Sequence, residues 1–325
     1  MSAEQYIYQA MSVHLREKEM LSKTDVEKLT AAEDVYKVYS ILGEKGWNTA
    51  DLTPADADRL LIAQENRTWD LVESLIGDLA PFNVLRCGND YHNLKAAIKL
   101  VYSDDLADTE KCFVKGVIDT AVILDAAKSR SFSMLPPDMA LAGENAFETL
   151  AHTGNGQYSD MIVDNAALIA IDKAGNDTDS SLLKEYARLT VDSANIKSAV
   201  RCCNMGKPRE FTERAVAFAG TLDAAALIKA AAESEDALYS YLSRTEYAEA
   251  INVLKRGIAA FERWCDNRII ASVRPQRNEY YTTDPMAAFI LARIIEIRTV
   301  KFILSAKINF LSMDTIMERL RETYV

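Results

Sequence analysis

The chain has 325 residues and carries 37 lysines and arginines against 48 aspartates and glutamates, a net charge of −11. A chain this acidic is poorly suited to holding a phosphate backbone, so nucleic acid is not an expected partner. With only 12 glycines and 7 prolines, it lacks the turn-forming residues that a β-sandwich or barrel needs for its many tight connections.

Apolar residues recur at helical spacing along the chain, and capping residues mark where the helices begin and end. Helix starts are predicted at the capping boxes Thr24–Glu27 and Thr30–Glu33, at Thr53 before Pro54, and at Asp284 before Pro285. Helix ends are predicted at residues 43–46, 103–105, 175–177 and 204–208, where Gly, Asn, Asp and Ser cluster. Alternating strand-like runs are nearly absent. The sequence therefore predicts an all-α protein.

Several signatures of other functions are missing. The N-terminus has no basic region followed by an apolar stretch, and no window approaches the ~18 uninterrupted apolar residues of a membrane span. There is no P-loop and no complete dinucleotide loop. The three histidines are far apart, and the five cysteines form no Cys-x-x-Cys pair. We therefore expect free thiols in a reducing cytoplasm, no metal and no cofactor.

The most informative feature is a short signature that occurs three times at separations of 102 and 104 residues. It reads acid, two residues, a small polar residue, an aliphatic residue, then lysine. Its polar members are Asp90, Asn93 and Lys95; Asp192, Asn195 and Lys197; and, in a looser copy, Glu296, Thr299 and Lys301. This period predicts three helical repeats, at residues 1–105, 106–208 and 209–325.

The spacing within the signature has a geometric meaning. Residues i and i+3 share one face of a helix, so the acid and the small polar residue lie together, while the lysine lies about 140° away. If the repeats surround a pseudo-threefold axis, the acid of one repeat could meet the lysine or a backbone amide of the next. We therefore expect these residues to dock the repeats against one another rather than to form three catalytic sites.

The order and spacing of these motifs resemble the C subunit of archaeal-type and bacterial V-type ATP synthases, whose family includes the d subunit (AC39) of eukaryotic V-ATPases. Residues 6–10 resemble that family's first helix, and the signatures at Asp90 and Asp192 match its recurrent motif. Residues 296–298 and 316–324 resemble its C-terminal signature, although Thr299 replaces the expected Asn. The resemblance spans the whole chain.

The resemblance implies a funnel-shaped, pseudo-threefold helical protein with no chemistry of its own. Such a protein would lie on the cytoplasmic face of the membrane proteolipid ring and hold the foot of the central stalk, which the D and F subunits form. It would pass torque between the ring that carries H⁺ or Na⁺ and the catalytic A and B subunits. It would span no membrane itself and would be held there by its protein partners.

An enzyme is the alternative. Residues 104–108 read DDLAD and match the DDxxD motif with which all-α prenyl diphosphate synthases hold Mg²⁺ and diphosphate. A second metal motif begins at Asn176, but Lys184 stands where its last acid is due. A solvated acidic turn is the favoured interpretation of residues 104–108.

Overall fold

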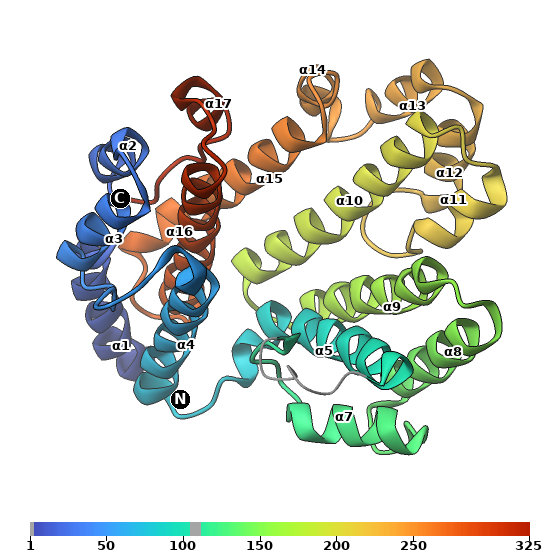
Figure 1. The fold of residues 1–325 in the computed structure, drawn as a ribbon, viewed down its shortest axis with the longest axis horizontal. Coiled ribbons are helices and arrows are strands. Elements are labelled where there is room, and N and C mark those ends of the chain that lie inside the picture. Colours follow the sequence, from blue (N-terminus) through green and yellow to red (C-terminus); the bar gives the residue numbers. More distant parts are fainter. Residues whose placement is uncertain (1–2, 105–111) are drawn as a thin grey trace. The chain divides into compact units, whose positions relative to one another are not determined.

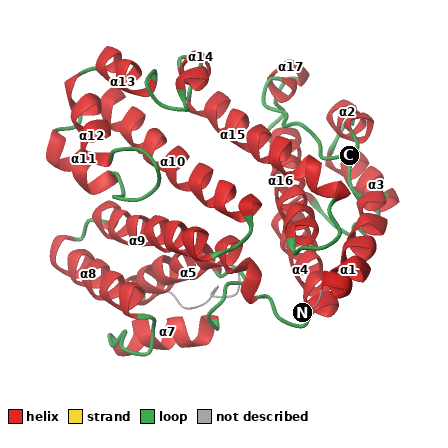
Figure 2. Ribbon diagram, turned by 180° about the vertical axis from the view of Figure 1, so that it is seen from behind, coloured by secondary structure: helices red, strands yellow, loops and turns green. Residues whose placement is uncertain are grey.

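The computed structural model describes residues 3–104 and 112–325. Within these residues the chain consists of helices and connecting loops (Figures 1 and 2), which confirms the predicted all-α class. The chain divides into two compact units. Unit 1 combines both ends of the chain, Met1–Pro81 and Val253–Val325, whereas unit 2 is the continuous segment Phe82–Asn252.

Unit 1 is built by helices from both ends of the sequence. They are α1 (Ala3–Arg16), α2 (Lys23–Ala31), α3 (Val35–Glu44), α4 (Ala57–Ile76), α15 (Ile258–Val273), α16 (Asp284–Ile308) and α17 (Met313–Met317). Figure 1 shows α16 beside α4. The core of this unit joins Leu29 and Leu42 from the N-terminal helices to Val300, Ile303 and Ile316 from the C-terminal ones. Burying each such side chain stabilises the fold by roughly 1.5–3 kcal/mol. Because the two ends of the chain both contribute these side chains, neither end completes this core alone.

Unit 2 is built by consecutive helices. They are α5 (Asn83–Ser103), α7 (Thr120–Ser129), α8 (Pro137–Thr153), α9 (Gly156–Asp177), α10 (Ser181–Asn204), α11 (Arg209–Ala215), α12 (Ala224–Glu233) and α13 (Glu235–Leu242). The short helix α14 (Ile251–Leu254) lies where the two units join in sequence. One core cluster packs Leu94 and Ile98 of α5 against Ile123, Ala146 and Val163 of α7, α8 and α9.

The predicted helix ends agree with the structure better than the predicted starts. Helices α3, α5, α9 and α10 end at Glu44, Ser103, Asp177 and Asn204, within the predicted ranges. The first start was misplaced, because Ser22 caps α2 together with Asp25, two residues before Thr24. The capping box at Thr30 was wrong. Thr30 lies inside α2, where its hydroxyl donates to the Val26 carbonyl, and Asp34 caps the next helix.

Of the other two predicted starts, the one at Thr53 keeps both the cap and the proline, whereas the one at Asp284 keeps the proline and moves the cap to Thr283. Thr53 and Asp56 form a capping box around Pro54, and the short 3₁₀ turn that follows leads into α4. Helix α16 begins at Asp284, with Thr283 in the capping position. None of the described helices is long and apolar enough to cross a membrane. The three-repeat division and the funnel arrangement stay predictions.

Candidate functional site

The first signature lies on the buried face of α5 and holds a stretch of loop backbone. The Asp90 carboxylate accepts hydrogen bonds from the amides of Val117 and Ile118 at 2.9 and 3.0 Å. One turn further along, the Asn93 amide group donates to the Val114 carbonyl at 2.8 Å and accepts from the Val114 amide at 2.9 Å. Both side chains are buried. Together they fix residues 114–118 against α5, directly before α7.

The second signature repeats this arrangement on α10. Asp192 accepts from the Thr221 amide at 2.9 Å and from its hydroxyl at 2.5 Å, and the Tyr247 hydroxyl donates to the same carboxylate at 2.9 Å. Asn195 bonds both backbone groups of Ala217 at 2.9 Å and also donates to the Ala219 carbonyl. The bound segment leads directly into α12. We call these two arrangements the backbone clamps.

A glycine lies beneath each clamp aspartate. A Cβ atom on Gly116 would lie 2.0 Å from the nearer carboxylate oxygen of Asp90, and one on Gly220 would lie 2.2 Å from that of Asp192. Gly220 also has a φ of +84°, a conformation that disfavours other residues. These glycines were not singled out in the sequence, although their separation of 104 residues matches the repeat period.

The third signature is only partly a clamp, and the segment it holds comes from the other end of the chain. Glu296 of α16 accepts from the Leu21 amide at 2.6 Å and pairs with Arg293 one turn before it. Leu21 precedes the cap of α2, just as Ile118 and Leu222 precede the caps of α7 and α12. The Thr299 hydroxyl instead donates to the Ile295 carbonyl of its own helix.

Two of the signature lysines pair with carboxylates of other helices. Lys95 donates to Asp164 of α9 at 2.5 Å, and the exposed Lys301 lies 3.4 Å from Asp58 of α4. Lys197 is half-buried on α10. Solvent-exposed pairs of this kind contribute about 0–1 kcal/mol. The buried contacts of the first two signatures are made by their acid and amide residues, whereas Lys95 and Lys301 form pairs at the surface.

Burial shifts the pKa of two of the signature acids, Asp90 and Glu296. It raises the pKa of Asp90, while the hydrogen bonds from the Ile118 and Val117 amides act in the opposite direction. Burial also raises the pKa of Glu296, and the Arg293 guanidinium opposes it. These acids face backbone amides and packed side chains. Their geometry suits holding a loop in place.

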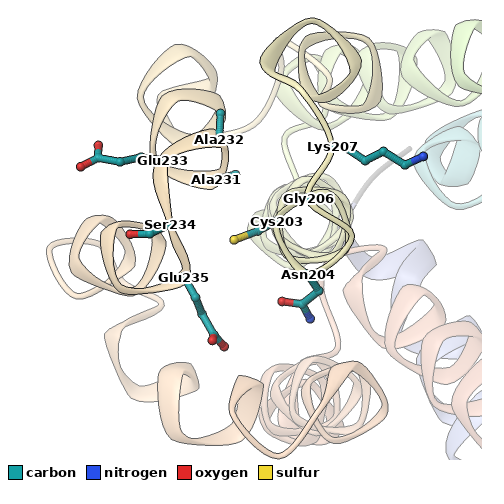
Figure 3. Close-up of a pocket in the computed structure, with 9 residues that line it drawn as sticks. All are labelled: Cys203, Asn204, Gly206, Lys207, Ala231, Ala232, Glu233, Ser234 and Glu235. Carbon is teal, nitrogen blue, oxygen red and sulfur yellow. The ribbon is translucent and has the colours of Figure 1, made fainter.

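A pocket of about 490 Å³ lies elsewhere in unit 2, between the end of α10 and the start of α13 (Figure 3). The Cys203 sulfur points into it, whereas Lys207 and Glu233 point away. Burial and the nearby Glu235 carboxylate raise the pKa of the Cys203 thiol. Because the thiolate is the nucleophilic form, this environment lowers the reactivity of Cys203 at neutral pH.

The metal motif of the enzyme alternative cannot be followed, because residues 105–108 lie outside the described part of the chain. Asp104, its first residue, has a left-handed backbone at the end of α5. Within residues 3–104 and 112–325, no three His, Cys, Asp or Glu side chains are grouped so that they could hold a metal ion.

Comparison with known families identifies the chain's relatives. A family model described as ATP synthase (C/AC39) subunit matches residues 12–319. The matched range contains all three signatures, both clamps and Leu21. A search of curated proteins finds no match.

Proposed function

Because the chain belongs to the ATP synthase (C/AC39) subunit family, we propose that it is the non-catalytic component that couples the central stalk to the membrane ring. As a family member it is a subunit of a V/A-type rotary ATP synthase. Its proposed partners are the D and F subunits of the stalk on one side and the proteolipid ring on the other. Its proposed place is the cytoplasmic face of the membrane.

The observation that carries this proposal is the extent of the family match, which covers nearly the whole chain and includes every signature residue. The clamps add a physical argument. A protein that passes torque must resist bending where its loops meet its helices. Buried polar groups whose hydrogen bonds are satisfied make such junctions stiff and specific.

The signature residues have a place in this proposal. Asp90, Asn93, Asp192, Asn195 and Glu296 join one predicted repeat to the backbone of the next, since residues 114–118, 217–222 and 21 belong to the following repeat in cyclic order. We propose that this is how the repeats are docked. Lys95 and Lys301 would then have minor roles in ion pairs on the helix surfaces, and the buried Thr299 would bond only within its own helix.

Binding to the stalk tests the proposed function directly. The purified chain is mixed with the D and F subunits of the same complex and separated by size-exclusion chromatography at low salt. We expect a stable ternary complex to elute as one peak. An unrelated helical protein of similar negative charge is the control for non-specific electrostatic binding. Failure of the chain to co-elute with D and F would contradict the proposal.

A further inference from the structure

The end of α16 and the short helix α17 expose a group of apolar side chains in unit 1. We call this group the apolar tip. Its members are Ile308, Phe310, Leu311, Met313 and Met317. They lie within ten consecutive residues, and Ile316 anchors the segment from beneath as a fully buried side chain. Contiguous exposed apolar groups of this kind mark sites of interaction more often than scattered single residues do.

Phe310 is the most unusual residue of the tip. Its side chain is 95% exposed, and its backbone has a φ of +55°. The Leu311 amide donates to the Ala306 carbonyl at 2.9 Å across this turn, an ending that normally places glycine at the left-handed position. A phenylalanine here strains the backbone and buries almost none of its ring. The fold gains nothing from this aromatic side chain, which points to a contact outside the chain.

Helix α17 places charge beside the apolar surface. Met313 and Met317 are exposed one turn apart, and Asp314 and Glu318 follow them at about 100° around the helix. Neither carboxylate forms an ion pair with another described residue. A complementary partner would therefore present apolar side chains edged by lysine or arginine. The two carboxylates would repel an anionic lipid surface and outnumber the exposed Arg319 beside them, whose guanidinium lies over the Phe302 ring.

We propose that the apolar tip docks against an amphipathic helix of the central stalk whose apolar face is edged by basic residues. This inference rests on the proposed function and assigns the surface that meets the stalk. Phe310 fills the centre of the contact, the two methionines adapt to the helix surface, and Asp314 and Glu318 pair with its basic edge.

The test measures the affinity of the full chain for the purified D–F complex by isothermal titration calorimetry. The variants are Phe310→Gly and the double charge reversal Asp314→Lys with Glu318→Lys. Met134→Ala is the control, because Met134 is another highly exposed apolar side chain, in unit 2 and outside the clamped segments. We expect each tip variant to weaken binding by about tenfold or more. The control should remain within roughly twofold of the wild type.

Thermal unfolding of each variant separates binding from folding. Phe310→Gly should not lower the unfolding temperature, because glycine adopts the left-handed conformation without strain. If Phe310→Gly does lower the unfolding temperature, the affinity of the Asp314→Lys, Glu318→Lys variant decides whether the apolar tip binds D–F. Tip variants that bind like the wild type would overturn the docking site and leave the proposed function standing. A wild-type chain that does not bind D–F would overturn both.

A second arm examines a lipid surface. The wild type and Phe310→Gly are sedimented with phosphatidylcholine–phosphatidylglycerol vesicles. We expect neither to bind. Vesicle binding that is lost in Phe310→Gly would overturn the stalk assignment in favour of a membrane contact.

Discussion

Each backbone clamp depends on single side chains whose substitution would remove hydrogen bonds to the loop. A carboxylate and an amide, three residues apart on one helix, satisfy backbone amides and carbonyls of a loop that have no partner in a helix or strand. Leaving such a group unsatisfied costs about 1–3 kcal/mol. The clamp residues therefore determine whether a loop is fixed to its helix.

Gly116→Ala and Gly220→Ala should both destabilise the fold. In each case the new Cβ would overlap a carboxylate oxygen of the clamp aspartate. We expect a loss of about 1–3 kcal/mol for Gly116→Ala from overpacking, and a larger loss for Gly220→Ala because its positive φ adds strain. Chemical denaturation measures both. Gly156→Ala is the matched control, since nothing lies within 4 Å of a Cβ at that position. Equal stability of all three variants would contradict the clamp geometry.

The raised pKa of Asp90 predicts a pH dependence. Its ordinary unfolded value is about 3.9, and burial raises the pKa in the folded chain. Between the unfolded and the folded pKa of Asp90, the folded state binds more protons than the unfolded state. The stability that protonated Asp90 contributes is therefore present at low pH and is lost as the pH rises through the folded pKa. Denaturation of the wild type and Asp90→Asn at about pH 4 and about pH 7 should show the wild type relatively more stable at the lower pH. If the wild type were instead more stable relative to Asp90→Asn at the higher pH, a raised pKa of Asp90 would be excluded.

At the scale of elements, one arrangement recurs three times. A long helix carries an acid that binds the amide just before the cap of a short helix. In the first two copies the bound amide lies 28 and 30 residues after the acid, whereas Leu21 lies 275 residues before Glu296. The third copy therefore ties the N-terminal segment to the C-terminal helix.

Hydrogen exchange can test the Glu296–Leu21 contact separately from the contacts of Asp192 with the Thr221 and Leu222 amides. Glu296→Gln removes the charge that holds the Leu21 amide, and exchange there should accelerate roughly tenfold. Exchange at Thr221 and Leu222 should not change, because Asp192 holds them in unit 2. The reciprocal variant Asp192→Asn should accelerate those two amides and leave Leu21 protected. Acceleration at all three amides in both variants would indicate general unfolding instead of local ties.

At the scale of the whole molecule, periodicity predicted the helices, and the repeated signature singled out the acids and amides that the structure shows to be buried. The clamped segments were not predicted, because their partner groups are backbone amides and carbonyls that leave no side-chain pattern. The recurrence of Gly116 and Gly220 was the one available signal. The joining of Leu21 to Glu296 was equally hidden, since no local pattern reports a contact across 275 residues.

Coupling is the central claim, and ion pumping measures it most directly. The complex is reconstituted into vesicles with and without this chain, and ATP hydrolysis and ion uptake are recorded together. Without the chain we expect hydrolysis by the catalytic subunits to continue while ATP-driven ion uptake is lost, and adding the purified chain should restore uptake. Undiminished ion uptake in its absence would contradict the account.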